Sequence, residues 1–270
     1  MPFLDTDDAL GGRAYYRHWA AEDPRSAVVF LHGFGEHTGV YHRYAFALNA
    51  RGIDVWAVDQ LGHGLSPGER GDVGSIEASS TLADALTDVV AEARPGLPLV
   101  AAGHSFGAVV TLFRVLATPD RYRAAVISGA PLAPVAELLD ADSSFGLDPG
   151  WLSADPFYLD ALENDPLAFV DADGATLTRE LDRAWDRFGA ELPTLAVPTR
   201  GARHRRPHRR RRGGTRLRRA DRTAVARRDR RRPARRAQRR QPPHGGCGGR
   251  RLRRRAHRGV TTARCRRSSW

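Results

Sequence analysis

The sequence of 270 residues contains no lysine, and it has only two cysteines and one methionine. Cys247 and Cys265 stand in an arginine-rich part of the chain without metal-ligand spacing, so we expect neither a disulfide framework nor a metal site. No apolar run reaches the roughly 18 residues that a membrane-spanning helix needs. Residues 1–8 are acidic and lack the apolar core of a signal peptide. We therefore expect a cytoplasmic protein without a transmembrane segment, and the sequence leaves its oligomeric state open.

Charge is distributed very unevenly along the chain. Residues 1–199 carry 13 arginines against 29 acidic residues, whereas residues 200–270 carry 30 arginines against two aspartates. The net charge of +12 is therefore the sum of −16 and +28. We expect residues 1–199 to fold as one domain, since that length can bury a sizeable core. Residues 200–270 combine low hydrophobicity with like charge, which predicts an Arg-rich, low-complexity tail that does not fold by itself.

Apolar runs in the first part predict a mostly parallel sheet. Arg13–Ala20 alternates weakly and predicts an edge strand. Continuous apolar runs predict strands buried on both faces at Ala27–Leu31, Ile53–Val58, Leu97–Ala102 and Ala124–Ser128. Helices are expected over Tyr41–Ala50 and Ser75–Ala93, and again from Phe106 onward. Strands that alternate with helices indicate an α/β fold with helices on both faces of the sheet.

The central motif is Gly103-His-Ser-Phe-Gly107, which lies between an apolar strand and an apolar helix. This is the G-x-S-x-G nucleophile elbow in its strand–turn–helix context. Gly103 and Gly107 let the chain turn sharply, because neither has a Cβ. The turn raises the Ser105 hydroxyl above the sheet edge, beside the N-terminal N–H groups of the helix. The motif therefore predicts Ser105 as a nucleophile.

The loop after the strand at Ala27–Leu31 reads His32-Gly-Phe-Gly-Glu-His37. In elbow-type hydrolases this loop supplies the second oxyanion N–H. We expect the backbone N–H groups of Phe34 and Phe106 to form the oxyanion hole, with His32, Gly33 and His104 as supporting residues.

The stretch from Asp59 to Gly71 is a long, glycine-shaped loop that contains His63. We expect the ring of His63 to bond the backbone and hold the turn, and not to act as a catalytic base. Residues 131–192 consist of short, irregular, aromatic-rich pieces and predict a small helical cap. Its aromatic side chains either line an acyl pocket or pack between cap and core. Four aspartates of this region suit helix caps and solvated positions better than catalysis: Asp140, Asp142, Asp148 and Asp155.

Five motifs in order and at matching spacing carry a family resemblance: His32–His37, Asp59-Gln-Leu-Gly-His-Gly-Leu-Ser66, Gly68-Glu-Arg-Gly71, Gly103–Gly107 and Asn164-Asp-Pro-Leu167. Over about residues 12–199 the chain resembles the monoacylglycerol lipase and lysophospholipase group of α/β-hydrolases, also called serine-aminopeptidase-like hydrolases. The resemblance implies a Ser–Asp–His triad without metal or organic cofactor. It also implies small lipid-like ester substrates, often with one acyl chain under the cap.

The family pattern breaks after Val197-Pro198-Thr199. A further strand, a loop Asp and a later His should follow, because the His must take the serine proton and the Asp must orient its ring. The sequence instead becomes Arg-rich from Arg200, and we expect no apolar strand or amphipathic helix there. The histidines of this part stand outside any family motif, so the triad acid and base stay unassigned: His204, His208, His244 and His257.

Two interpretations of the break stay open. Residues 200–270 either form a polycationic tail that binds nucleic acid or anionic surfaces non-specifically, or they result from a shifted reading frame. Codons for Arg200–Arg209 can be chosen so that the frame one base later encodes Val-Val-His-Gly-Thr-Asp-Asp-Pro-Ile-Ala, a strand and an acid loop. Codons for Arg231–Arg239 then encode Gly-Ala-Arg-His-Asp-Ala-His-Asn-Asp, a histidine loop. We favour the shifted frame, because the tail begins where a required strand should begin.

The sequence thus predicts a serine hydrolase that cleaves carboxylic esters but is impaired without its acid and base. The rival is a non-catalytic protein whose polycationic tail binds polyanions. Peptidase or acyltransferase chemistry on the same fold also stays open, as do the acyl length and head group.

Overall fold

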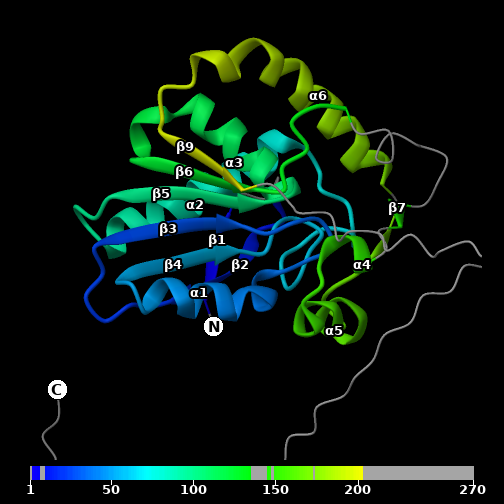
Figure 1. The fold of residues 1–270 in the computed structure, drawn as a ribbon, viewed down its shortest axis with the longest axis horizontal. Helices are drawn as coiled ribbons and strands as arrows, with labels where there is room; N and C mark the ends of the chain where they lie inside the picture. The colour runs from blue at the N-terminus through cyan, green and yellow to red at the C-terminus, as the bar shows by residue number, and fades with distance from the viewer. Residues whose placement is uncertain (1, 7–9, 135–144, 147–148, 173, 203–270) are drawn as a thin grey trace, which may run out of the picture. The chain divides into compact units, whose positions relative to one another are not determined.

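The computed structural model describes residues 2–6, 10–134, 145–146, 149–172 and 174–202. All of them lie in one compact unit, Met1–Arg212. One sheet with the order β1-β2-β4-β3-β5-β6-β9 runs through this unit (Figure 1). Its strands are β1 Phe3–Asp5, β2 Arg13–Trp19, β3 Ser26–Leu31, β4 Ile53–Val58, β5 Leu99–His104, β6 Ala124–Ser128 and β9 Thr199–Ala202.

The α/β prediction is confirmed, and the sheet is parallel from β4 to β9. Strands β1 and β2 pair antiparallel at one end. The expectation that residues 13–20 form the edge was wrong, because β1 pairs outside β2. Leu4 of β1 is buried, so this added strand extends the core on that side.

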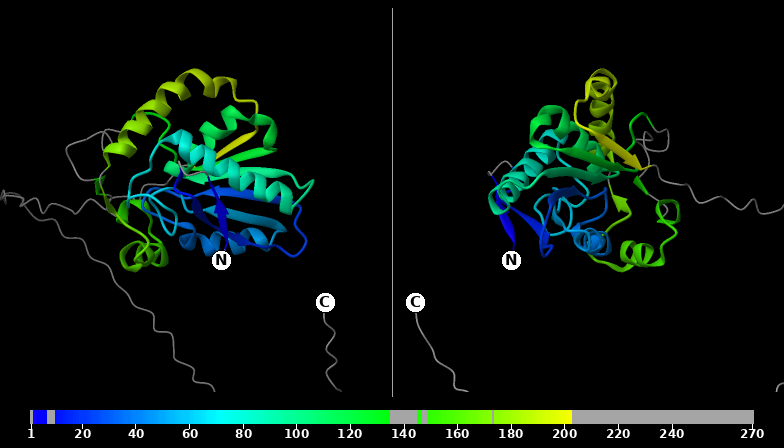
Figure 2. Two further views of the ribbon diagram at one scale, coloured as in Figure 1. Left: turned by 180° about the vertical axis from the view of Figure 1, so that it is seen from behind. Right: turned by 60° about the vertical axis from the view of Figure 1, so that its left-hand side comes forward.

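Helices cover the sheet on both faces (Figure 2). They are α1 His42–Asn49, α2 Ile76–Ala93 and α3 Phe106–Ala117, with α6 Ala175–Glu191 packed in the same core as α3; α4 Pro149–Leu152 and α5 Pro156–Asn164 lie beyond one end of the strands (Figure 1). Helix α2 starts at its N-cap Ser75, whose side chain accepts from the Ala78 N–H at 3.0 Å. Its apolar face joins α3 and α6 in the main core cluster.

Alternating side chains of the central strands pack into two separate hydrophobic clusters, one on each face of the sheet. Val29 and Leu31 of β3 pack in the main cluster, whereas Val28 and Phe30 pack with Ala45 of α1 in a second cluster. Both faces of β3 are therefore buried, as its continuous apolar sequence predicts.

The region between β6 and β9 contains α4, α5, a two-residue ladder and α6. The ladder pairs β7 Phe145–Gly146 with β8 Asp171–Ala172. Helix α6 packs in the main cluster through Leu181, Trp185 and Phe188. Contact with the core, and not an acyl pocket, thus accounts for Trp185 and Phe188.

Strand β9 extends the sheet past the predicted break. It pairs parallel with β6, with Val126 opposite Arg200 and Ser128 opposite Ala202. The sequence predicted no apolar strand from Arg200, and β9 is not one; residues 200–202 join the sheet through backbone pairing, which needs no apolar side chain. All four residues of β9 are exposed, in line with the absence of an apolar pattern.

Candidate active site

Ser105 joins the end of β5 to the start of α3. Its φ of 49° makes it the only non-glycine residue with positive φ in the described part of the chain, and its ψ is −118°. Such a conformation costs on the order of 1–3 kcal/mol and persists only where the surroundings enforce it. The Ser105 N–H donates to Ser128 O at 2.8 Å, which ties the turn to the end of β6.

Two glycines make this turn possible, as the sequence predicts. A Cβ at Gly103 would lie 2.3 Å from Gly107 O. A Cβ at Gly107 would lie 2.3 Å from both Leu31 O and His32 O. These atoms belong to the backbone and cannot move aside, so α3 approaches β3 as closely as a main chain allows.

The sheet register places the loop after β3 beside the turn. Strands β3 and β5 pair in parallel with Leu31 opposite Gly103, so His32 and His104 continue from adjacent strands. A Cβ at Gly33 would lie 3.3 Å from the His104 ring. Loop 32–37 and the Ser105 turn therefore meet at the carboxyl edge of the sheet.

His32 is a fully buried side chain that orients this loop. Its Nδ1–H donates to Gly33 O at 2.8 Å, and its Nε2 accepts from the Gln60 N–H at 2.9 Å. Burial lowers the pKa of His32, so the ring is neutral and the two nitrogens have fixed roles. In a trans peptide the N–H points opposite to the C=O, so the hold on Gly33 O also sets the direction of the Phe34 N–H.

Phe106 is the first residue of α3, and its side chain is buried. The first N–H groups of a helix have no intrahelical acceptor and carry the positive end of its dipole. The structure thus brings the Phe106 peptide, the Phe34 peptide and Ser105 to the same sheet edge.

His63 holds a turn, as expected. Its Nδ1–H donates to Leu61 O at 2.8 Å, and its ring packs against Phe34 and Phe169. Burial lowers the pKa of His63 to about 3, so it stays neutral near pH 7.

Among the described residues, no histidine is hydrogen-bonded to the Ser105 hydroxyl. His37 donates from Nε2 to Asp165 at 3.1 Å and accepts at Nδ1 from the Gly39 N–H, so both of its nitrogens are occupied. The four histidines of the Arg-rich part lie outside the described residues: His204, His208, His244 and His257.

A second histidine–carboxylate pair joins His18 and Asp54 at 2.9 Å. Asp54 is the second residue of β4, so this pair lies towards the opposite edge of the parallel sheet. Neither pair is hydrogen-bonded to Ser105 within the described part of the chain.

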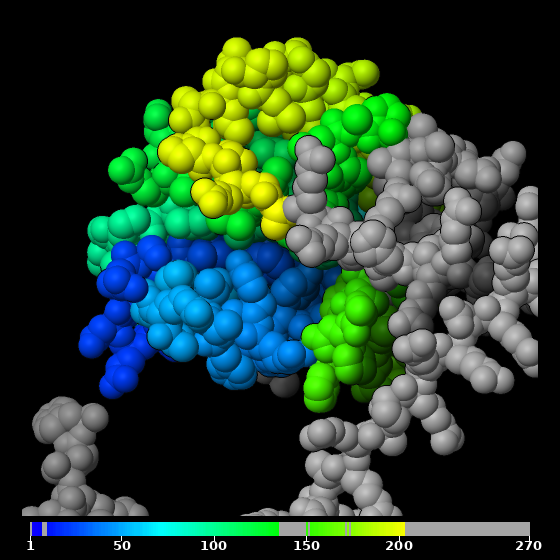
Figure 3. Space-filling model, in the orientation of Figure 1, coloured from blue at the N-terminus to red at the C-terminus, as the bar shows by residue number. Residues whose placement is uncertain are grey.

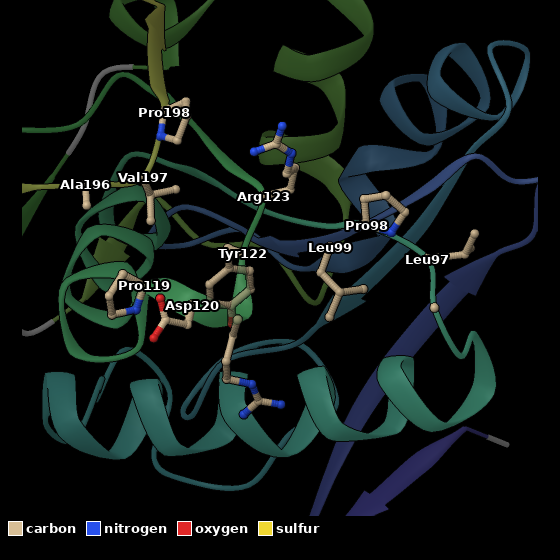
Figure 4. A pocket seen from close by; sticks show the side chains of 12 residues that line it. Leu97, Pro98, Leu99, Pro119, Asp120, Tyr122, Arg123, Ala196, Val197 and Pro198 are labelled. Carbon is tan, nitrogen blue, oxygen red and sulfur yellow. The ribbon is translucent and has the colours of Figure 1, made fainter.

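The structure also shows a cavity of about 680 Å³ away from Ser105 (Figure 4). Its walls are residues 96–99, 119–123 and 196–198, which lead into β5, β6 and β9. This is the amino-terminal edge of these strands, whereas Ser105 follows their carboxyl edge. Within the described ranges, no cluster of His, Cys, Asp and Glu is arranged to hold a metal ion, and no helix could cross a bilayer.

The sequence did not single out Glu36, although it lies within the His32–His37 motif. Glu36 is 2% exposed, and its carboxylate accepts the Gly33 N–H at 2.7 Å. An acidic residue inside a glycine-rich turn after a buried strand was the signal that could have indicated a role for Glu36. Its hydroxyl partners, Tyr41 and Tyr158, lie outside the motif, so the sequence does not connect them to it.

Known proteins with similar sequences agree with this fold. Residues 22–200 match the family model described as serine aminopeptidase, S33. A monoacylglycerol lipase of Mycolicibacterium smegmatis is 32% identical over 211 residues, which cover 69% of this chain and 71% of that protein. The human monoglyceride lipase is 28% identical over 218 residues, with coverages of 73% and 72%.

Solved structures agree with this assignment. A monoacylglycerol lipase of Paleococcus ferrophilus superposes with a TM-score of 0.59 at 27% identity, covering 70% of this chain and 77% of that chain. A soluble variant of the Saccharomyces cerevisiae monoglyceride lipase shares the fold, with a TM-score of 0.61 at 20% identity over 74% of each chain. The chain therefore belongs to the serine aminopeptidase S33 family of α/β-hydrolases and is by family a carboxylic ester hydrolase.

Proposed function

We propose that this protein is a serine hydrolase for small lipid-like esters of the monoacylglycerol or lysophospholipid type. The observation that carries the proposal is the backbone conformation of Ser105. This residue has a φ of 49° and lies at the carboxyl edge of the sheet beside loop 32–37. The monoacylglycerol lipase relatives support a substrate with one acyl chain.

In this mechanism the Ser105 hydroxyl attacks the ester carbonyl. The Phe34 and Phe106 N–H groups stabilise the tetrahedral oxyanion, which collapses as the C–O bond to the alcohol breaks. The alcohol leaves with the proton that the Ser105 hydroxyl lost, and water then hydrolyses the acyl–Ser105 ester to the free acid and restores the hydroxyl. His32, Gly33 and His104 support the loop and the turn. The proposal assigns no acid or base, because the described residues offer none to Ser105.

Loss of the general base typically costs about 10⁴–10⁶ in kcat. We therefore expect this chain to hydrolyse p-nitrophenyl esters very slowly, and a chain with the shifted frame restored to hydrolyse them readily. Sequencing the codons for residues 197–201 tests the frame directly. Rapid turnover by the present chain that Ser105→Ala abolishes would contradict the missing base. Absence of turnover by the restored chain would contradict ester hydrolysis.

A second candidate activity rests on charge alone. Residues 200–270 carry a net +28, which is sufficient for sequence-independent binding of a polyanion. Titration of the full chain with a DNA duplex at rising salt tests it, and binding that survives moderate salt would favour this activity.

A further inference from the structure

Glu36 is a buried carboxylate that the proposed chemistry does not use. Its Oε2 accepts from the Gly33 N–H at 2.7 Å and from the Tyr41 hydroxyl, and its Oε1 accepts from the Tyr158 hydroxyl. No ion pair found among the described residues includes Glu36, so hydrogen bonds stabilise its charge. Burial and the charge of Glu36 raise the pKa of both tyrosines, so both phenols remain donors.

Glu36 holds the two peptide groups that flank Gly33, the Gly33–Phe34 peptide through its backbone N–H and the His32–Gly33 peptide through its side chain. Its backbone N–H donates to Gly33 O at 3.2 Å, while its side chain accepts the Gly33 N–H. Gly33 O and the Phe34 N–H belong to one peptide group and point in opposite directions. A shift of Glu36 therefore rotates the N–H that would donate to the oxyanion.

The two tyrosines on Glu36 come from different parts of the chain. Tyr41 ends the short 3₁₀ helix Thr38–Tyr41, which directly follows loop 32–37. Tyr158 lies in α5 and is 122 residues away from Glu36 in sequence. The first contact is local, whereas the second exists only while α5 is seated on the loop.

Further contacts join the loop to the cap segment, defined here as residues 156–169. The Phe169 N–H donates to Gly35 O at 2.9 Å, and the His37 ring donates to Asp165 at 3.1 Å. The Phe169 ring packs edge-on against Phe34 with centroids 5.4 Å apart. A Cβ at Gly35 would lie 2.1 Å from Phe169 O, so this approach requires glycine. Loop 32–37 and the cap segment are thus joined by several hydrogen bonds and a ring contact.

We propose that Tyr158 is a positioning residue that acts through Glu36, so that the Phe34 N–H is aligned for the oxyanion only while the cap segment is seated. This inference rests on the proposed function, since it deepens the role of Phe34 there. Displacement of the cap segment removes a donor from Glu36 and loosens the Gly33–Phe34 peptide. The cap segment therefore controls transition-state stabilisation.

Amide hydrogen exchange on the full chain tests the coupling without any chemistry. Tyr158→Phe removes one hydroxyl at the cap, and exchange in residues 33–40 should rise at least about fivefold. The matched control is Tyr44→Phe, because Tyr44 is a half-buried tyrosine of α1 that packs on Phe30. The control should leave residues 33–40 unchanged. Equal exchange in Tyr158→Phe and the native chain would overturn the proposal.

The rate at which a fluorophosphonate labels Ser105 tests whether Tyr158 affects stabilisation of the oxyanion. The Ser105→Ala variant gives the baseline. Tyr158→Phe should lower the maximal labelling rate about tenfold, less than the loss of an oxyanion donor itself, and leave the probe concentration for half-maximal rate within twofold. A purely structural role would lower the melting temperature and leave the maximal rate unchanged.

Adding Tyr158→Phe to Glu36→Gln should cause no further loss, because both act through one carboxylate. Additive losses would place the action of Tyr158 elsewhere. Absence of Ser105-dependent labelling in both the present chain and the chain with the shifted frame restored would refute the proposed function, whereas the exchange result decides the coupling by itself.

Discussion

The half of the sheet formed by β4, β3 and β5 and the half formed by β6 and β9 differ in how many of their faces are covered by other elements. Strands β3 and β4 are buried on both faces, by α2 and α3 on one and by α1 on the other. In β6, Ala125 and Ile127 are buried whereas Val126 between them is 40% exposed. In β9 every residue is exposed. Figure 3 shows α1, in blue, over the first half and the yellow residues of β9 at the surface of the second half.

This difference separates the parts of the candidate site. Ser105 and loop 32–37 follow β5 and β3, within the covered half, and the closest glycine contacts hold them there. From the sequence, the acid and the base are expected to follow a strand after residues 197–199, which is where β9 pairs with β6. The uncovered half is thus where the Arg-rich part of the sequence begins. The elbow is complete although its partners are not assigned.

The largest effect should come from the close approach of α3 to β3 in the covered half. Gly107→Ala places a Cβ 2.3 Å from two backbone oxygens, so we expect a loss of about 4 kcal/mol or more in the free energy of unfolding. Gly189→Ala in α6 is the control, since a Cβ there meets nothing within 4 Å. Urea unfolding should show that variant unchanged or more stable by up to about 1 kcal/mol. Similar losses in both would contradict the packing described for the elbow.

The sequence predicted the elbow and the central strands because their signals are local. A continuous apolar run identifies a strand buried on both faces, and two glycines around Ser105 identify the turn. The Glu36–Tyr158 contact could not be predicted, because it joins residues 122 positions apart and depends on the cap fold. The first strand was missed because three residues, Phe3–Asp5, are too few for a pattern. Strand β9 was missed because it relies on backbone pairing.

Truncating one side chain in each half of the molecule compares how well the two halves of the sheet are buried. The quantity compared is the loss in free energy of unfolding. Leu86 of α2 is fully buried in the main cluster, and Leu86→Ala should cost about 3 kcal/mol. Val126→Ala should cost less than about 1 kcal/mol, because much of that side chain already contacts water. Both are measured by urea unfolding of the full chain. A loss above about 1.5 kcal/mol for Val126→Ala would mean that something covers this face in solution.

The covered half should also make stability depend on pH. Unfolded His63 binds a proton below about pH 6.5, whereas folded His63 binds one only near pH 3. The unfolded state therefore holds more protons between these values, so this stabilisation is complete above pH 6.5 and is lost as pH falls. From about pH 7 to about pH 4.5 we expect a loss of about 2 kcal/mol through His63. His63→Gln should flatten the pH profile, and an unchanged slope would contradict its buried, neutral state.

The smallest effect is expected at β9, and it distinguishes the two interpretations of the Arg-rich part. In this chain Arg200→Val and Gly201→Val should each change the free energy of unfolding by less than about 0.5 kcal/mol, since added apolar area there stays in water. The shifted frame has valine at both positions. In a chain with that frame restored, replacing either valine by alanine should cost about 1–2 kcal/mol, because the strand would then be buried. A gain above about 1 kcal/mol for Arg200→Val in the present chain would show that β9 is already covered, and the contrast between the two halves of the sheet would not hold.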